Sequence, residues 1–515
     1  MNQFKGENKI MKIIIILISS MLISSIASAN EFLLKPKGKY EVGFKDYHWV
    51  HGNKNSDRNY ICSDEKQDPF YKYGQAKNTF SANNQVNFCR EIMARIYFPI
   101  TNHGSKSFET IYNPSSSSLI AEIKILNIGN VTDNDYNQFN ALKTWTYNFN
   151  DINNFNSFIL NQNKNKFPVL FFLPGNGEVV QDYENFIVEL TSHGYIVVGV
   201  NNPFVSGPIL MPNAGMKNLN TNNRTVIRND EIIQKAHDAG EDLTGTVPVN
   251  DILFALEKTF QNIQLAKDGS LFTYMDKENI AVFGHSGGAN ASVMVSHNED
   301  AVSRFRIKAV ASLDSGYGVF ASANCINVAT GQVFTNPPPP TVFYGNLDTV
   351  GTDIPFMHLH SSAQGYGCSF GMNAYLEKES IQPPDNLMVH NKNEYWVYMA
   401  PQNVLDSIPT TALPIPISIS SGVFYTAHHN FNDYGTLQNL PLFQKVIQYF
   451  RAKNPTDLQT PLSIGTADGE KITNQINLYL KDFFDFYLKQ KDTKYLKSCT
   501  PISSDTLLSC KNANE

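Results

Sequence analysis

The stretch IAVFGHSGGAN at residues 280–290 constrains the fold of this chain more than any other feature. An apolar run of strand length leads directly into GHSGG (284–288), which fits the pattern G-x-S-x-G, and small residues that suit a helix follow it. A serine in this context stands on a strained turn, where side chains at positions 284 and 288 would collide with neighbouring backbone. The pattern predicts that Ser286 projects from the sheet as a nucleophile; the alternative is an ordinary glycine-rich turn.

Apolar runs on both sides of this turn predict a parallel sheet. Residues 167–173 and 195–200 are continuous apolar runs of strand length, and residues 184–192 between them have helical spacing. A strand, a helix and a strand in succession indicate parallel pairing. The alternation continues with predicted helices at 249–261 and 288–296 and predicted strands at 280–283, 307–313 and 340–344. We therefore predict the α/β class and the α/β-hydrolase fold, a mostly parallel doubly wound sheet with long surface insertions.

The N-terminal region, residues 1–29, has the pattern of an export signal. Residues 11–29 (MKIIIILISSMLISSIASA) combine one Lys, an apolar run and the small-x-small sequence ASA that signal peptidase cleaves, and Met11 is an alternative start. The apolar run is shorter than the roughly 20 residues that a membrane-spanning helix needs. We expect the signal to be cleaved and the mature protein to be periplasmic or extracellular.

Residues 30–515 are predicted to form one domain with two insertions. Residues 90–99 alternate in the manner of an edge strand, and residues 101–165, rich in Asn and Ser, are predicted to be largely polar surface connection. Residues 354–419, punctuated by Gly and Pro, are predicted to be an insertion that forms a lid over the pocket. A helix is predicted to close the chain at 476–489.

Cysteine usage agrees with export. An even number of cysteines in an exported chain favours disulfides, and pairing between sequence neighbours is the simplest of the 15 connectivities that six allow. The expected pairs are Cys62 with Cys89, Cys325 with Cys368, and Cys499 with Cys510. The net charge is -6 without a clustered basic stripe, which argues against nucleic acid as a partner.

Activation of the serine needs a histidine that takes its proton and an acid that orients the histidine. In this fold both follow the serine, the acid first. Among the 12 histidines, the pair His428 and His429 follows an apolar stretch near the end of the chain, so one of them is the expected base. Asp314 ends KAVASLD and Asp348 ends TVFYGNLD, so each follows a predicted strand. The spacing leaves both acids open.

No metal and no other cofactor is expected for this chemistry. His358 and His360 have the spacing of a metal-binding pair, but no carboxylate stands at a matching distance in the sequence. We interpret both as solvated loop residues.

Four stretches resemble the type II platelet-activating factor acetylhydrolase family, the lipoprotein-associated phospholipase A2 group. GKYEVG (38–43) with residues 94–99 resembles the opening strands of that family, and ENIAVFGHSGG (278–288) resembles its nucleophile turn. RFR with the strand after it (304–314) resembles the segment that leads to the family's acid, and TAHHNFNDY (426–434) resembles its histidine motif. The resemblance is scattered over residues 38–490.

For the site, the resemblance implies His428 rather than His429 as the base, and Asp314 rather than Asp348 as the acid. In LPGNG (173–177), the position of the family's oxyanion donor is Asn176, whose backbone N–H would act together with that of Gly287.

For the activity, the resemblance implies hydrolysis of short or oxidised acyl esters of phospholipids through an acyl-Ser286 intermediate. The region of the family's apolar interfacial helix is polar in this sequence, which implies at most peripheral membrane contact. The alternative is a polyester, cutinase-like or general carboxylesterase, in which the acid usually stands at the position of Asp348. A binding module that kept the fold is a third reading, but such relatives usually lose a member of the triad.

Overall fold

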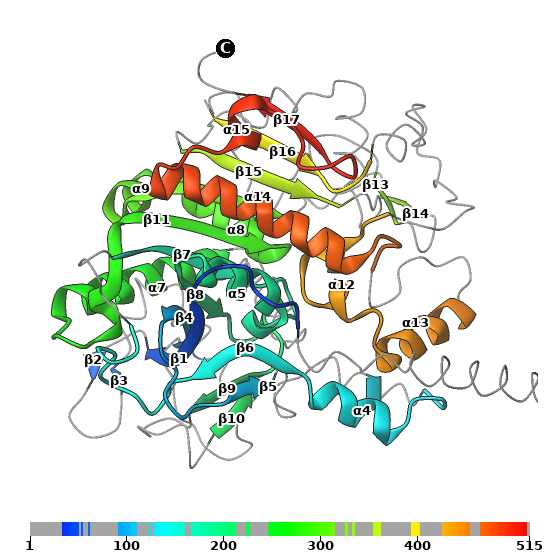
Figure 1. Cartoon of the computed structure of the whole chain (residues 1–515), viewed down its shortest axis with the longest axis horizontal. Coiled ribbons are helices and arrows are strands. Elements are labelled where there is room, and N and C mark those ends of the chain that lie inside the picture. The colour runs from blue at the N-terminus through cyan, green and yellow to red at the C-terminus, as the bar shows by residue number, and fades with distance from the viewer. Residues whose placement is uncertain are drawn as a thin grey trace, which may run out of the picture.

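A twisted sheet of 11 strands runs through the middle of the molecule (Figure 1). In sheet order the strands are β17 (Leu507–Lys511), β16 (Glu394–Tyr398), β15 (Phe356–His360), β12 (Ile307–Leu313), β11 (Met275–His285), β7 (Phe167–Leu173), β8 (Ile196–Asn201), β4 (Glu91–Ile100), β1 (Glu41–Val50), β6 (Lys143–Asn148) and β5 (Phe108–Thr110). The strands from β16 to β8 pair in parallel, and β4 and β17 pair with them antiparallel.

The computed structural model describes part of the chain. The described residues are 33–50, 53–54, 60–61, 91–110, 123–124, 128–159, 166–212, 223–226, 246–314, 325–327, 332–334, 354–361, 393–401, 425–453 and 464–511. The predicted signal region, the predicted strand at 340–344 and Asp348 lie outside them.

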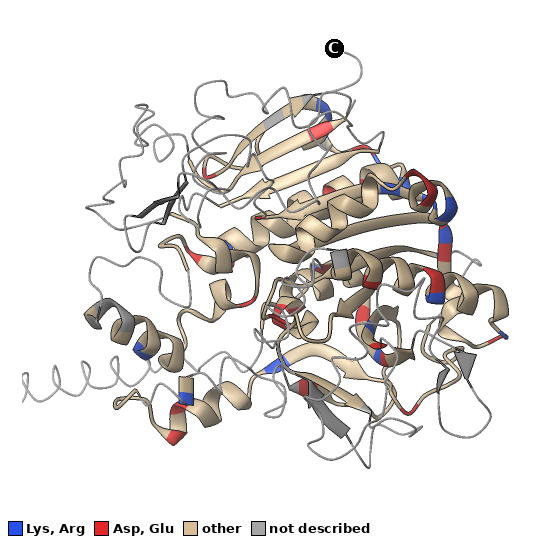
Figure 2. Cartoon of the chain, turned by 180° about the vertical axis from the view of Figure 1, so that it is seen from behind, with Lys and Arg blue, Asp and Glu red and all other residues tan. Residues whose placement is uncertain are grey.

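Helices cover both faces of the sheet. On one face lie α5 (Glu184–Ser192) and α14 (Gly469–Lys489), which crosses the front of the view in Figure 1. On the other lie α7 (Thr246–Leu265), α8 (Gly287–Ser296) and α9 (Glu299–Phe305). Successive residues of β7 pack into the two cores in turn, since Phe171 joins the α7 side and Phe172 the α5 side. This double burial explains why the central strands are continuous apolar runs, and Figure 2 shows them uncharged over most of their length.

The fold class predicted from the sequence is confirmed, with differences in detail. β7 and β12 have the predicted bounds, and α14 begins at Gly469 rather than at 476. The strand predicted at 90–99 corresponds to β4. The prediction that this strand lies at the edge of the sheet is wrong, because β4 lies between β8 and β1. Both of its faces are largely buried, so a pattern that suggested one solvated face was misleading.

Both predicted insertions contribute strands to the sheet. The stretch 101–165 contains β5, β6 and α4 (Asp133–Asn140), and β6 pairs with β1. The stretch 354–419 contains β15 and β16, which extend the sheet beyond β12. The lid interpretation is therefore wrong for these two segments, and the rest of that stretch lies outside the described residues.

The described residues include one of the three expected disulfides. A disulfide joins Cys499, at the end of α15 (Lys494–Ser498), to Cys510 in β17, as predicted. The side chains of the other two expected pairs lie outside the described ones. Among the helices that the structure describes, none has the length and apolar character needed to cross a bilayer.

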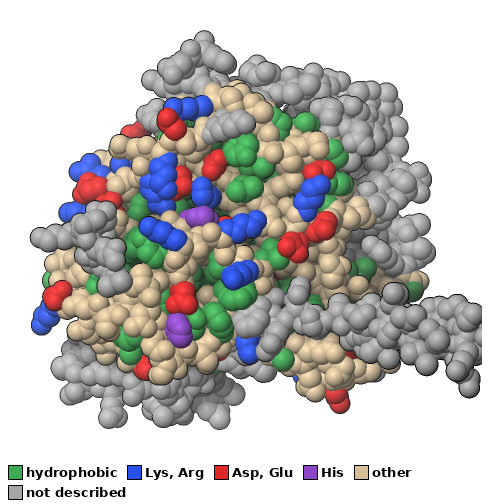
Figure 3. All heavy atoms as spheres, in the orientation of Figure 1, with side chains coloured by type: hydrophobic (Ala, Val, Ile, Leu, Met, Phe, Trp, Pro, Cys, Tyr) green, Lys and Arg blue, Asp and Glu red, His purple; other side chains and the backbone are tan. Residues whose placement is uncertain are grey.

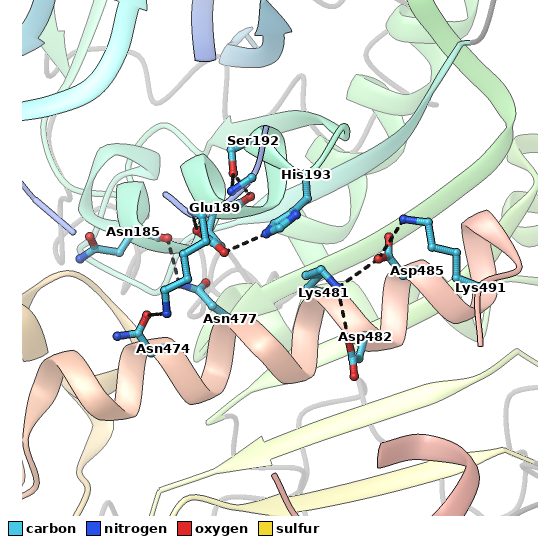
Figure 4. Close-up of polar contacts among 12 residues, drawn as sticks. Asn185, Glu189, Ser192, His193, Asn474, Asn477, Lys481, Asp482, Asp485 and Lys491 are labelled. Atoms are coloured by element: carbon cyan, nitrogen blue, oxygen red, sulfur yellow. Dashed lines mark hydrogen bonds and ion pairs between the residues drawn. The ribbon is translucent and has the colours of Figure 1, made fainter. Parts of the chain in front are cut away.

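The amino ends of β7 and β11 open onto a basic groove of about 640 Å³ beside the end of α14. Lys and Arg side chains gather on this face of the molecule (Figure 3). At its rim Asp485 of α14 receives Lys481, Lys489 and Lys491 at 3.2, 3.0 and 3.3 Å. The polar row of α14 that faces α5 continues from there (Figure 4), with Asn477 donating to the carbonyl oxygen of Asn185 at 3.2 Å.

Candidate active site

Ser286 stands on a strained turn at the carboxyl end of β11. Its φ and ψ are 53° and -122°, a conformation that L-residues rarely adopt outside special sites. The two flanking glycines are sterically required, because a Cβ at Gly284 would lie 2.4 Å from the carbonyl oxygen of Gly288, and one at Gly288 would lie 2.3 Å from that of Leu173. The Ser286 N–H donates to the carbonyl oxygen of Leu313 at 3.0 Å, which ties the turn to the end of β12.

Asp314 follows β12 directly and is held by the neighbouring strand. Its N–H donates to the carbonyl oxygen of Leu359 at 2.8 Å, and its Oδ1 accepts the N–H of Ser361 at 2.7 Å. The side chain is buried and the residue has a φ of 42°. Two strained residues, Ser286 and Asp314, thus stand at the ends of adjacent parallel strands.

His428 brings its ring to Asp314. Its Nδ1 lies 2.7 Å from Asp314 Oδ2, and its ring centroid lies 4.4 Å from that of His285, the residue before Ser286. Burial alone would raise the pKa of Asp314, but the hydrogen bond and charge of His428 outweigh burial and lower it to about 2. The acid is therefore ionised at neutral pH. His429, in contrast, turns to Glu178, with Nε2 3.5 Å from Oε1.

The loop after β7, residues 174–178, packs against the start of α8. A Cβ at Gly287 would lie 2.5 Å from Asn176 Oδ1, so these two residues are in direct contact. Within the described part of the chain, no acceptor takes the backbone N–H of Asn176 or of Gly287. Both residues are half-buried, so two backbone donors stand at one accessible place at the positive end of a helix.

A buried polar network beside these groups was not predicted from the sequence. We call Glu178, Tyr183, His285 and Asn432 the Glu178 network. Glu178 Oε2 accepts the hydroxyl of Tyr183 and lies 3.1 Å from His285 Nδ1, while Oε1 accepts Asn432 Nδ2 at 2.5 Å. Burial would raise the pKa of Glu178, but its contacts with His285, His429 and Tyr183 outweigh burial and hold it below its usual range. The carboxylate is charged.

The interpretation of His358 and His360 as solvated loop residues is wrong. Both lie buried in β15, with His358 Nδ1 2.8 Å from Ser312 Oγ and its Nε2 3.0 Å from His360 Nδ1. Burial lowers the pKa of His358 well below its usual value and that of His360 to about 4. Both are neutral at pH 7 and pack behind the strand end that fixes Asp314.

One group of the described residues brings three potential metal ligands together. Single ligand atoms of His285, Asp314 and His428 lie within 4.8 Å of one another. Asp314 and His428 already share a proton, so a cation would have to compete with their hydrogen bond. That no metal is needed stays a prediction.

Comparisons with known proteins identify the fold. The sequence matches no protein-family model, and no curated protein matches it either. Among solved structures, the chain is similar to a ferulic acid esterase from Streptomyces cinnamoneus, with a TM-score of 0.53 and 16% identity over 93% of this chain and 99% of that chain. At this identity the likeness establishes the α/β-hydrolase fold.

Proposed function

We propose that this protein is a serine hydrolase of carboxylic esters, with Ser286 as nucleophile, His428 as base and Asp314 as acid. The observation that carries the proposal is the 2.7 Å contact between His428 Nδ1 and Asp314 Oδ2, made beside a serine on a strained turn. With Nδ1 directed to the carboxylate, we assign to Nε2 the transfer of the serine proton. In this proposal Asp314, which follows β12, orients His428, and Asp348 has no role in the triad.

The reaction follows from these roles. Ser286 Oγ attacks the ester carbonyl carbon while His428 Nε2 takes the hydroxyl proton, and Asp314 stabilises the imidazolium that forms. The carbonyl oxygen becomes an oxyanion, which the N–H groups of Asn176 and Gly287 stabilise. The C–O bond to the alcohol then breaks, and His428 returns the proton to the leaving oxygen. Water, activated by the same histidine, cleaves the acyl-serine and releases the acid.

For the substrate, we propose short or oxidised acyl esters of phospholipids. Two observations support this class over a polyester. The acid in contact with the base is the one at the position used by the platelet-activating factor acetylhydrolase-like motif, and the motif residue Asp433 binds the His428 segment to the start of α5, where it accepts the N–H groups of Glu184 and Asn185. A general carboxylesterase is the second candidate, since the similar solved structure is described as a ferulic acid esterase.

The test combines covalent labelling with a substrate panel. A fluorophosphonate probe is expected to label Ser286, and Ser286→Ala to abolish both labelling and turnover, because every covalent step passes through this hydroxyl. The panel compares a 2-acetyl phospholipid, a long-chain phospholipid, ethyl ferulate and a polyester film. Cleavage of the 2-acetyl phospholipid above the other three supports the phospholipid proposal. Labelling at a different residue, or an active alanine variant, would overturn the serine assignment.

A further inference from the structure

The Glu178 network joins three segments that each carry a group of the candidate site. Glu178 ends the loop that contains Asn176, His285 precedes Ser286, and Asn432 stands four residues after His428. These segments are far apart in the sequence, since His285 follows Glu178 by 107 positions and Asn432 follows it by 254. The pairing of β7 with β11 places the first two segments side by side, and the side chains of the network join all three at the carboxyl ends of the strands.

Tyr183 connects the network to the loop that carries Asn176. A phenol can donate one hydrogen bond and accept two, and the Tyr183 hydroxyl does all three. It donates to Glu178, accepts the N–H of Gly175 at 2.9 Å, and lies 2.7 Å from His285 Nδ1. In this arrangement His285 Nδ1 carries the proton. Its Nε2 has no hydrogen-bond partner among the described residues and is buried, facing the cluster that includes Asp314 and His428.

Burial keeps His285 neutral, which suits a ring beside the base. Burial and the neighbouring His428 lower the pKa of His285, against the opposite effect of Glu178. When His428 becomes an imidazolium during turnover, a neutral aromatic ring at 4.4 Å does not repel it, whereas a second cation would.

The segment that carries His428 is also bound to the start of α5, through Asp433. Asp433 accepts the N–H groups of Glu184 and Asn185, the first residues of α5, at 2.8 and 2.9 Å, and its own N–H donates to the carbonyl oxygen of Asp182 at 2.8 Å. The loop that carries Asn176 runs into α5 through the 3-10 helix η1 (Val180–Tyr183). A shift of the oxyanion loop would therefore move the base.

From this geometry we propose that Tyr183 and Glu178 are positioning residues that fix the oxyanion loop relative to the nucleophile turn and the base. The inference rests on the proposed function, because it assigns a role in the same reaction. The Gly175 N–H points at Tyr183 and not at the substrate, so this amide holds its neighbour Asn176 in place. Donors that are fixed before the reaction are the ones that stabilise an oxyanion.

The first experiment is Tyr183→Phe against a matched control, Tyr97→Phe. Tyr97, in β4, is equally buried and donates at 2.7 Å to the buried carboxyl of Glu184, whose backbone N–H rather than its carboxyl binds Asp433. With 4-nitrophenyl acetate, Tyr183→Phe is expected to lower kcat about 10- to 100-fold with KM within about threefold, because a displaced donor weakens only the transition state. Tyr97→Phe is expected to keep kcat within about twofold while its Tm falls by a similar amount.

A reciprocal exchange separates positioning from general damage. Glu178→Gln and Asn432→Asp alone each remove the contact between the two side chains. Together they restore it with the donor and acceptor exchanged, while the new amide oxygen at position 178 still accepts Tyr183 and the new carboxylate at position 432 still accepts the Tyr434 N–H. The double variant is expected to recover at least about tenfold in kcat over Asn432→Asp.

Hydrogen exchange measures the positioning without relying on activity. Peptides that cover residues 174–178 are expected to exchange faster in Tyr183→Phe than in Tyr97→Phe. Equal exchange in the two variants together with an unchanged kcat, or a double variant no better than the singles, would overturn the positioning role. Failure of the esterase proposal is recognised separately, since it appears as turnover that survives Ser286→Ala, and the exchange experiment still decides whether the network holds the loop.

Discussion

Two buried tyrosines donate to carboxylates at opposite ends of the central sheet, and their surroundings differ. Tyr183 donates to Glu178 at the carboxyl ends of the parallel strands, and Tyr195, directly before β8, donates to Asp485 at 2.7 Å at the amino ends. Burial would raise the pKa of both carboxyls. The contacts of Glu178 with His285, His429 and Tyr183, and those of Asp485 with its lysines and Tyr195, outweigh burial and hold both pKa values below the usual range. Each site is a charged acceptor surrounded by donors.

The partners of the two carboxylates come from different distances along the chain. Asp485 is neutralised by lysines within six residues of itself, two of them at the i,i+4 spacing of one helix. Apart from Tyr183, which is five residues along the chain, the side chains that the network brings to Glu178 lie more than a hundred residues away in the sequence. The first network stabilises one helix end against a groove, whereas the second determines how three loops meet. The difference predicts that damage at Asp485 lowers stability, and that damage near Glu178 lowers turnover.

The largest expected difference in kcat is between alanine variants of two adjacent histidines, His428, which contacts Asp314, and His429, which contacts Glu178. His428→Ala is expected to reduce kcat by several orders of magnitude, since removal of the base in another serine hydrolase costs on the order of 10⁶. His429→Ala removes a longer contact to Glu178 and a ring contact with Tyr434, and it is expected to stay within about tenfold. Steady-state kinetics with 4-nitrophenyl acetate measures both. The reverse ranking would move the base by one residue and weaken the family resemblance.

The next contrast compares an aspartate at each end of the sheet. Asp314→Asn is expected to lower kcat about 10⁴-fold with the fold intact, because the amide cannot stabilise the imidazolium. Asp485→Asn at the opposite end is expected to leave kcat within about twofold. Asp348→Asn is the further control and is expected to stay within about tenfold. A dead Asp348→Asn and an active Asp314→Asn would contradict the acid assignment and favour the polyester or general carboxylesterase alternative.

These contrasts also show which parts of the site a sequence can reveal. The nucleophile turn is recognisable because its steric demands fall on positions 284 and 288, next to Ser286 itself. Asp314 and Asp348 were equivalent by spacing, since each follows a predicted strand. The family resemblance favoured Asp314, and its contact with His428 supports the same choice.

The features that the sequence did not reveal depend on partners from other strands. Glu178 is a single acid after a glycine-rich loop, and nothing local indicates that Asn432 will reach it. His358 and His360 looked solvated because Ser312, the partner of His358, lies on the neighbouring strand β12. The same holds for β4, whose place inside the sheet depends on strands at 41–50 and 196–201.

A pH experiment compares how His360, at the site end of the sheet, and Asp485, at the opposite end, affect the pH dependence of the unfolding free energy. The folded-state pKa of His360 is lowered to about 4 from 6.5, so below pH 6.5 the unfolded chain binds a proton that the folded chain does not. Unfolding free energy is therefore expected to fall as pH drops from about 6.5 towards 4, by roughly 3 kcal/mol for this group alone. Urea unfolding at several pH values measures the slope. His360→Gln should flatten it and Asp485→Asn should not; an unchanged slope in His360→Gln would contradict the assignment.

The smallest expected effect concerns the tyrosine of the opposite end. Tyr195→Phe removes one hydrogen bond to a charged acceptor that keeps its three lysines, so the expected cost is about 1–2 kcal/mol of unfolding free energy. Because none of these groups reaches the carboxyl ends of the strands, kcat is expected to stay within about twofold of the parent, in contrast to Tyr183→Phe. Urea unfolding and steady-state kinetics on the same preparation give both quantities. A tenfold fall in kcat for Tyr195→Phe would mean that the two ends of the sheet are coupled, and the separation of a stabilising network from a positioning network would then fail.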